Sequence, residues 1–248
     1  MKDQRIEVIL SKIKEKGIVS TLELTEELNV TEMTIRRDLK YLEDKKLLIR
    51  IHGGAKSIKK IQQEKLYDDR KIKYMKEKEH ISKIAASYIQ DGETVFIAPG
   101  TTTERIPEFI KAKNVTVVTN SYSVMVKYSH LDLDFIVTGG RLRRKTEAII
   151  PDYFLDSISK INVDKCFIGA NGVSGNKVTI SNYDEGLIQQ IVMENAKERF
   201  LLLDSSKFNR EAFYSFFKVE DLDGIITDGN LRQDIMKEYK KITKIINI

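Results

Sequence analysis

Basic and hydroxyl side chains cluster in one segment near the N-terminus of this 248-residue chain. Ile35, Leu39 and Leu42 recur there at helical spacing, so at about 100° per residue the side chains between them project outward. Arg can bind guanine O6 and N7 together, Met and Thr methyl groups can contact thymine, and Lys suits phosphates. The segment predicts a DNA-binding face, whose candidate residues are Thr31, Met33, Thr34, Arg36, Arg37 and Lys40.

A second set of candidate binding residues lies in polar loops that follow apolar runs further along the chain. One loop has a glycine followed by three threonines before a helical stretch, which offers backbone N–H groups and hydroxyls to an anion. In open α/β sheets, ligands bind outside the carboxyl ends of the strands, so we expect such loops to meet. They predict a phosphate or phosphosugar site, whose candidate residues are Gly100, Thr101, Thr102, Thr103, Asn120, Gly140, Arg141 and Lys207.

Three short helices are expected to position the basic face. Apolar residues at helical spacing predict helices over residues 6–13, 21–28 and 31–42. Thr21 and Thr31 are suitable N-caps for the second and third of these. Asn29-Val30 leaves only a short turn between them, which is typical of a helix-turn-helix.

A hairpin is expected to follow the third helix. Leu47–Ile51 has the apolar character of a strand, and the Gly53-Gly54 pair permits a tight turn, so these residues predict a wing. For Arg36-Arg37 alone, a solvated basic surface is the alternative interpretation. The helix-turn-helix and the wing together favour DNA binding.

Seven short apolar runs alternate with helical stretches from about residue 81 onward. Most are continuous rather than alternating, which is typical of strands buried on both faces of a parallel sheet. The predicted strands cover residues 94–97, 115–118, 135–137, 165–168, 200–203, 225–227 and 244–246. We therefore expect an α/β fold with a winged helix-turn-helix at 1–57, a polar and partly helical linker at 58–80, and a mainly parallel α/β phosphosugar-sensing domain at 81–248.

The net charge of +5 is unevenly distributed along the chain. Residues 1–80 hold 20 Lys and Arg against 15 Asp and Glu, whereas residues 81–248 hold 22 of each, so the whole excess lies in the first third and suggests a polyanion partner. No apolar run reaches the roughly 18 residues of a membrane span, and the N-terminus lacks the apolar core of a signal peptide. The single Cys166 and three dispersed histidines exclude an internal disulfide and a Cys/His zinc cluster. We expect a cytoplasmic protein without a metal or cofactor.

The N-terminal residues resemble the DeoR-type winged-helix signature. The resemblance is carried by Gly17–Val19, Leu24–Val30, Thr34–Leu39, Leu42-Glu43 and Arg50–Ala55. It implies a bacterial transcriptional regulator, usually a repressor of sugar-use genes, that binds double-stranded operator DNA as a homo-oligomer. His52 and Gly53, in the predicted wing, join the DNA-binding candidates on this basis.

Residues 81–248 resemble the DeoR sensor domain, which is similar in fold to ribose-5-phosphate isomerase. Val118–Asn120, Gly139-Gly140, Asp164–Gly172 and Asp204–Lys207 carry this match. Ala98-Pro99-Gly100 stands where most members have Asp-Ser-Gly. That loop, together with Arg141, Thr146–Ala148 and Asp184-Glu185, resembles the lactose phosphotransferase repressor branch. The resemblance implies tagatose 6-phosphate as effector and adds Asp184 and Glu185 to the effector-binding candidates.

A sugar-phosphate isomerase or deaminase carrying a DNA-binding head is the rival interpretation. Such chemistry needs a carboxylate or histidine that moves a proton beside the substrate carbon. Gly169–Gly175, where the related isomerases are acidic, contains no acid. Asp184 and Glu185 come next and could act as bases, although such pairs more often flank a helix. We therefore expect a sensor that binds its ligand without turnover. An architectural DNA-binding protein without an effector is disfavoured by the donor-rich loops.

Overall fold

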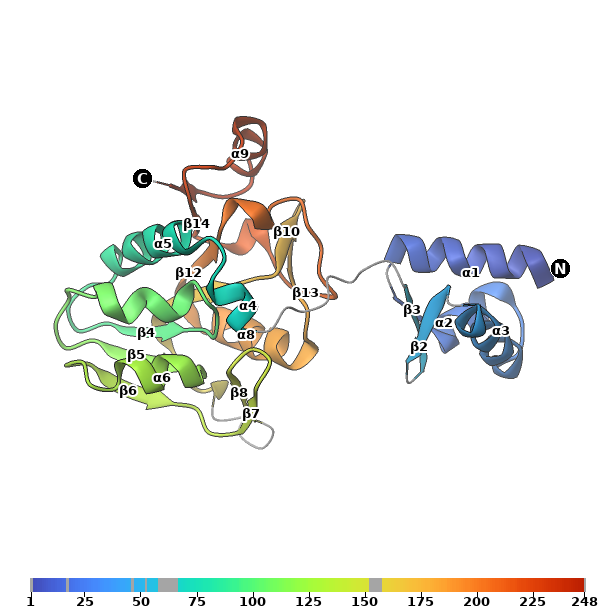
Figure 1. Cartoon of the computed structure of the whole chain (residues 1–248), viewed down its shortest axis with the longest axis horizontal. Helices are drawn as coiled ribbons and strands as arrows, with labels where there is room; N and C mark the ends of the chain where they lie inside the picture. Colours follow the sequence, from blue (N-terminus) through green and yellow to red (C-terminus); the bar gives the residue numbers. More distant parts are fainter. Residues whose placement is uncertain are drawn as a thin grey trace. The chain divides into compact units, whose positions relative to one another are not determined.

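The chain folds as two compact units, Met1–Glu64 and Lys65–Ile248 (Figure 1). The computed structural model describes residues 2–16, 18–45, 47–51, 53–57, 67–151 and 158–247. Among these residues, no helix combines the length and the apolar character that a membrane span requires. We call the first unit the head and the second the sensor unit.

The head is a winged helix-turn-helix, as predicted. Its helices are α1 (Lys2–Lys16), α2 (Thr21–Leu28) and α3 (Glu32–Asp44), and its strands are β1 (Ile18–Ser20), β2 (Leu48–Ile51) and β3 (Gly54–Ser57). Thr31 caps α3 as expected, because its side chain accepts a hydrogen bond from the Thr34 amide. Asn29 ends α2 in the left-handed conformation with φ 48°, which makes the turn between the two helices tight.

The start of α2 differs from the prediction by one residue. Ser20, not Thr21, is the N-cap, and its hydroxyl accepts from the Glu23 amide at 3.0 Å. Thr21 is buried, and its backbone N–H donates to the Gly53 carbonyl at 2.7 Å. This bond ties α2 to the wing turn. The strand β1 was not expected either, since three residues carry too little pattern to be recognised, but it pairs with β3 and completes a three-stranded antiparallel sheet.

All seven strands predicted for the sensor unit form, and they lie in one sheet with the order β15-β14-β12-β9-β4-β5-β6. They are β4 (Thr94–Ile97), β5 (Thr116–Thr119), β6 (Asp134–Val137), β9 (Val163–Gly169), β12 (Ala196–Leu203), β14 (Gly224–Thr227) and β15 (Ile245–Ile246). Every neighbouring pair is parallel, so all carboxyl ends share one edge. β12 begins four residues before the predicted start because Ala196–Arg199 pair with β9 although their side chains are mostly polar.

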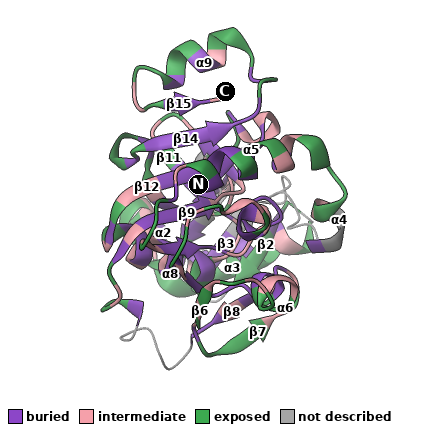
Figure 2. Ribbon diagram, turned by 90° about the vertical axis from the view of Figure 1, so that its left-hand side faces the viewer, coloured by how far each residue is buried: buried purple, intermediate pink, exposed green. Residues whose placement is uncertain are grey.

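Side chains from both faces of the sheet are buried. Phe200 and Leu202 pack into one core, and Leu201 and Leu203 into the other. The first core lies under α5 (Met75–Ser87), the 3-10 helix η1 (Thr103–Phe109) and α6 (Tyr122–Tyr128). The second lies under α8 (Tyr183–Glu194) and α9 (Gln233–Tyr239). The central strands are accordingly buried, whereas the outer surfaces of the helices are exposed (Figure 2).

Two small antiparallel sheets of the sensor unit were not predicted from the sequence. One is the hairpin of β7 (Arg141–Arg143) and β8 (Ala148–Ile150). The other contains β10 (Gly172–Ser174), β11 (Lys177–Ile180) and β13 (Tyr214–Lys218). The short 3-10 helices η2 (Ser205–Lys207) and η3 (Val219–Asp221) lie between larger elements. The strands of the small sheets are too short to show an alternation of apolar and polar residues in the sequence.

The sensor unit begins before residue 81. The expected linker covered residues 58–80, of which 58–66 lie outside the described residues. The described residues from Tyr67 onward belong to the compact sensor unit, which includes the short helix α4 (Tyr67–Lys71) and all of α5. Tyr67 and Lys78 are both buried, at 4% and 5% exposure. These two side chains anchor the stretch to the sensor unit, whereas residues 71–76 between them are exposed.

The close packing of β1 on β3 leads to a stability prediction. A Cβ at Gly54 would lie 2.1 Å from the Val19 carbonyl oxygen, so the Gly54→Ala substitution forces β1 away from β3. We expect Gly54→Ala to destabilise the head by about 1–3 kcal/mol, the usual cost of overpacking, in urea denaturation followed by circular dichroism. Gly229→Ala is the control, because a Cβ there meets nothing within 4 Å. Equal effects of the two substitutions would contradict this account.

Candidate functional site

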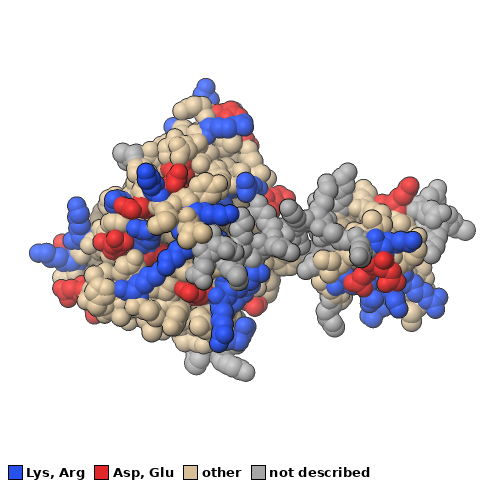
Figure 3. All heavy atoms as spheres, in the orientation of Figure 1, with Lys and Arg blue, Asp and Glu red and all other residues tan. Residues whose placement is uncertain are grey.

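The exposed face of α3 is basic, as the spacing predicted. Ile35, Leu39 and Leu42 are buried in the core of the head. The opposite side exposes Met33 at 60% and carries polar and basic side chains. Those that are exposed or half-buried are Thr31, Thr34, Arg36, Arg37 and Lys40. Figure 3 shows Lys and Arg side chains gathered on the part of the head where α3 lies.

The residues on this face differ in how far they are already engaged. Arg36 forms an ion pair with Glu32 one turn earlier at 2.6 Å, and the Thr31 and Thr34 hydroxyls lie 3.0 Å apart at the helix start. Arg37 and Lys40 are exposed and form no ion pair among the described residues. They are therefore the cations best able to reach an external polyanion.

A buried ion pair fixes the orientation of α3. Asp38 is 3% exposed and accepts a hydrogen bond from Arg5 Nε of α1 at 2.5 Å. The carboxylate raises the pKa of the Arg5 guanidinium, mainly through this hydrogen bond. Asp38 thus turns away from the outward face, where Glu32 is the acid that pairs with Arg36. Gly53 lies in the wing turn with φ 76°, a conformation that favours glycine, and His52 lies outside the described residues.

In the sensor unit, the loop after β4 is compact and internally bonded. Thr103 is fully buried, and its hydroxyl donates to the Ala98 carbonyl at 2.7 Å. The Gly100 carbonyl accepts from the Glu104 amide at 2.9 Å, and the Thr102 carbonyl accepts from the Ser82 hydroxyl of α5 at 2.7 Å. Thr103 and Gly100 therefore shape the loop. The side chains of Thr101 and Thr102, each 8% exposed, remain as candidates to meet a ligand.

Cations gather around this loop. Lys78 of α5 is buried, and burial lowers the pKa of its ammonium to about 8. Lys207, in η2 after β12, and Arg70 lower that pKa further, whereas Asp204 opposes them. Lys78 and Lys207 therefore lie close enough to repel each other, although they are 129 positions apart in the sequence. Such a cluster of positive charge is stabilised by a bound anion.

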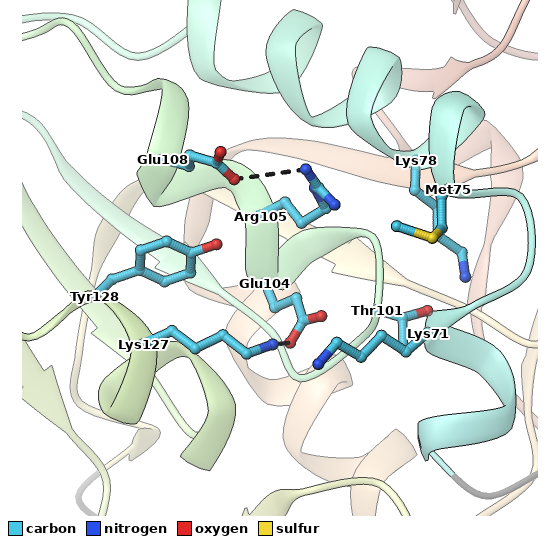
Figure 4. Close-up of a pocket in the computed structure, with 9 residues that line it drawn as sticks. All are labelled: Lys71, Met75, Lys78, Thr101, Glu104, Arg105, Glu108, Lys127 and Tyr128. Carbon is cyan, nitrogen blue, oxygen red and sulfur yellow. Dashed lines mark hydrogen bonds and ion pairs between the residues drawn. The ribbon is translucent and has the colours of Figure 1, made fainter.

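Lys78 and Thr101 line one pocket (Figure 4). Its other lining residues are Lys71, Met75, Glu104, Arg105, Glu108, Lys127 and Tyr128. Lys71, from α4, and Lys127, from α6, reach toward the same space beside Glu104. Glu104 is 2% exposed, and burial raises the pKa of its carboxyl against the opposing effect of Lys127, which is 2.7 Å away. The pocket thus combines three ammonium groups and a guanidinium with two carboxyl groups, one of them buried, and two hydroxyls.

A second group of candidate residues gathers at the β7–β8 hairpin. Asn120 is buried; its Nδ2 donates to the Ile149 carbonyl at 3.1 Å, while its Oδ1 has no partner among the described residues. A Cβ at Gly140 would lie 2.1 Å from the Ile150 carbonyl oxygen, so this glycine permits the close approach of the hairpin. Arg141 is exposed at the start of β7.

The two acidic residues at the start of α8 have different roles. Glu185 is 7% exposed and accepts hydrogen bonds from Arg143, at 3.0 Å, and from the Thr146 hydroxyl. Its carboxylate therefore fastens the hairpin to α8. Asp184 is exposed in the first turn of α8, where a carboxylate favours the helix dipole. Neither group lines the pocket described above.

Several pocket residues were absent from the sequence-based candidates. Lys78 falls in the stretch taken for a linker, and Lys71 lies beside it. Lys127 lies directly after Val124–Val126, where a lysine among apolar residues of a helix was a usable signal. Glu104 directly follows the three threonines, but nothing in the sequence distinguishes it from a surface acid of a first helical turn. Among the described residues, no group of His, Cys, Asp and Glu could hold a metal ion.

Two family patterns match the chain. Residues 5–61 match the DeoR-like helix-turn-helix domain, and residues 73–229 match the DeoR C terminal sensor domain. Relatives named lactose phosphotransferase system repressor are similar over nearly the whole length. One from Staphylococcus epidermidis is 34% identical over 96% of both chains, and one from Streptococcus mutans is 34% identical over 99% of both.

Solved structures also resemble the chain, at lower identity. A D-ribose-5-phosphate isomerase in complex with phospho-erythronic acid is 17% identical, with a TM-score of 0.40 over 53% of this chain and 52% of that one. The beta subunit of eIF2B from Chaetomium thermophilum is 18% identical, with a TM-score of 0.49 over 68% of this chain and 54% of that one.

The exposure of Arg37 and Lys40 leads to a paired prediction for DNA binding. We expect Arg37→Ala to weaken binding to a preferred duplex by about 1–3 kcal/mol and to relax base preference, because a bidentate base contact is lost. Lys40→Ala should weaken all duplexes alike and reduce the salt dependence by about one phosphate contact. Fluorescence anisotropy with a duplex selected by the wild-type protein from random sequences, across a salt series, measures both.

The control for this pair is Arg232→Ala, which removes an exposed arginine of the sensor unit that pairs with Asp234. It should change neither affinity nor salt slope. An Arg37→Ala protein that keeps both affinity and base preference would show that α3 does not read bases through this side chain.

Proposed function

Since the chain belongs to the DeoR family, with that family's helix-turn-helix and sensor domains, we propose that it represses sugar-utilisation genes and that a phosphorylated sugar releases it from its operator. The relatives named lactose phosphotransferase system repressor point to lactose use as the controlled process. Tagatose 6-phosphate is the first effector to test. The protein acts in the cytoplasm, where the operator is, as a homo-oligomer whose heads bind paired half-sites.

The observation that carries the proposal for an effector is the cluster of Lys78 and Lys207 beside the Thr101-Thr102 loop. Burial is the main cause of the lowered pKa of Lys78; repulsion from Lys207 adds to it, and Asp204 opposes it. A phosphate dianion removes this repulsion and accepts hydrogen bonds from both cations and from hydroxyls. The same sugar without phosphate offers no such charge, so the site favours the phosphorylated form.

The sugar portion of the effector extends toward the β7–β8 hairpin in this proposal. Asn120 Oδ1 is a buried acceptor without a partner among the described residues, and so is free for a sugar hydroxyl. Arg141 and Asp184, both exposed near the hairpin and α8, supply further polar groups. Gly140 and Glu185 contribute by holding the hairpin in place rather than by touching the ligand.

An isomerase or deaminase activity is the second candidate, and Glu104 is the observation that favours it. Burial raises the pKa of this carboxyl, which is a property of general acids and bases. Its ion pair with Lys127 and the names of the relatives favour a binding role instead. Incubating the pure protein with tagatose 6-phosphate and related sugar phosphates, and analysing the products, separates the two candidates.

Removal of one cation should produce a repressor that cannot be induced. We expect Lys207→Ala to bind operator normally but to lose at least about tenfold in affinity for tagatose 6-phosphate, because a charged hydrogen bond contributes roughly 1.5–3 kcal/mol. Thr101→Val, which keeps the shape and deletes a hydroxyl, should have a smaller effect in the same direction. Isothermal titration calorimetry and operator release in anisotropy measure the two properties.

The control is Lys237→Ala, on the exposed surface of α9. Plain tagatose is the matched ligand and should bind far more weakly than its phosphate. Equal affinity for the two sugars, or full induction of the Lys207→Ala protein, would overturn the phosphate site.

Effector binding near pH 8 should take up protons. With a pKa of about 8, Lys78 is partly neutral at that pH, and a bound dianion favours its charged form and so raises the pKa. The expected uptake is about half a proton per site at pH 8, and affinity should fall as the pH rises beyond this value. Calorimetry in buffers of different ionisation enthalpy measures the uptake, which Lys78→Met should abolish. A wild-type protein that binds without uptake would show that Lys78 does not face the anion.

A further inference from the structure

The helix α4 is the first described element of the sensor unit and follows the head closely in the chain. Tyr67, its first residue, is ten positions after Ser57, the last residue of β3 (67 − 57 = 10). A connection of that length can span at most roughly 35 Å when fully extended. A change in the position or order of α4 therefore changes directly how the head is tethered.

Contacts at both ends hold α4 against the sensor unit. The Tyr67 amide donates to the Lys145 carbonyl at 3.1 Å, in the turn of the β7–β8 hairpin. The Tyr67 hydroxyl accepts from Lys127 Nζ at 3.0 Å, and this ammonium lies 5.5 Å from the centre of the Tyr67 ring. At the other end, Lys78 Nζ donates to the Arg70 carbonyl. α4 thus depends on two ammonium groups and one hairpin carbonyl.

The ammonium groups of Lys78 and Lys127 also line the pocket described above. Lys78 and Lys127 lie there with Lys71, which α4 itself contributes (Figure 4). In the structure these cations bind neutral partners of α4, a carbonyl and a phenol. A phosphate is a stronger acceptor for an ammonium than a carbonyl or a phenol is, because it carries the opposite charge. An anion in the pocket therefore competes with α4 for the same donors.

We propose that α4 is the coupling element of this protein: an anionic effector draws Lys78 and Lys127 away from the Arg70 carbonyl and the Tyr67 hydroxyl, and so releases α4 and loosens the tether of the head. The inference rests on the effector site proposed above, extended from Lys78 and Thr101 into the pocket that they line together with Lys127, and states how that site is linked to the DNA-binding unit. Lys127 keeps its ion pair with Glu104, since an ammonium has three donors.

The boundary between the released and the fixed parts lies at Tyr74. This residue joins α4 to α5 and has φ 55°, a left-handed conformation that is strained for a bulky side chain. Beyond it, α5 is anchored by Ile81 and Ala85, which are fully buried in the sheet-covering core. In this proposal the backbone of α5 stays in place when α4 is released, so the backbone changes only before Tyr74, while the side chains of Lys78 and Lys127 exchange partners.

Removing the phenol separates this coupling from effector binding itself. Tyr67→Phe deletes the acceptor for Lys127 but keeps the buried ring, and Tyr67 is not a lining residue of the pocket. Since the effector no longer has to break this contact, we expect tagatose 6-phosphate to bind about 2–10-fold more tightly, the range for one lost hydrogen bond. By reciprocal coupling, operator binding without effector should weaken. Tyr122→Phe, an exposed tyrosine of α6, is the control.

Hydrogen exchange of the full-length protein measures directly whether α4 is docked on the sensor unit. The Tyr67 amide is protected only while α4 is docked on the Lys145 carbonyl. In wild type we expect tagatose 6-phosphate to raise its exchange by about tenfold or more, with α5 amides around Ile81 unchanged. Tyr67→Phe should show raised exchange without any ligand, and Tyr122→Phe should behave as wild type.

The outcomes distinguish this inference from the proposed function. If the sugar phosphate binds and releases DNA while the Tyr67 amide stays protected, the coupling role of α4 is overturned and the effector site stands. If calorimetry detects no binding of any sugar phosphate, both are overturned. Weaker effector binding by Tyr67→Phe would show that the phenol supports the site rather than competing with the ligand, and would also overturn the proposal.

Discussion

Each central strand of the seven-stranded sheet is covered on both faces, and this burial fixes where polar groups of the sensor unit can lie. Alternate residues of β12 enter two separate cores, so the strand interior has no place for an uncompensated donor or charge. Polar side chains therefore appear where the strands end. Because all strands are parallel, the loop after β4, Asn120 after β5 and η2 after β12 share one edge. The site is a consequence of the direction of the strands.

Charged groups are concentrated at that edge. Burial is the main reason that the ammonium form of Lys78 is disfavoured; Lys207 and Arg70 add to this effect, and Asp204 opposes it. Glu104 is buried in an ion pair with Lys127. Elsewhere in the sensor unit, a buried cation is surrounded by acids: Lys165 pairs with both Glu93 and Glu198. Lys165 thus belongs to a structural ion-pair network, whereas Lys78 donates to a carbonyl and can serve the anion site that we propose.

In the head, by contrast, the cations of α3 are exposed rather than buried. Asp38 lies in the same helix as Arg36, Arg37 and Lys40, but its carboxylate points inward to Arg5 of α1. The inward pair fixes α3 against α1 and keeps the Asp38 carboxylate away from the outer face. The wing is fixed just as locally, through the Thr21–Gly53 backbone bond and the close packing at Gly54.

The main helices of the head, the seven strands of the large sheet and the family of both units followed from the sequence by itself. The apolar period of 31–42, the Gly-Gly turn and the seven continuous apolar runs specify a winged helix-turn-helix and a parallel sheet, because these patterns arise from local geometry and burial. The basic face of α3 followed for the same reason.

The tertiary structure alone decided which polar residues meet. Lys78 and Lys207 come together only across the folded sheet, and Glu185 turned out to fasten a hairpin. Tyr67, in a stretch that has the composition of a linker, is buried against Lys127. The composition and the apolar periodicity of a segment indicate which of its residues are exposed to solvent. Contacts between distant segments depend instead on the packing of the whole unit.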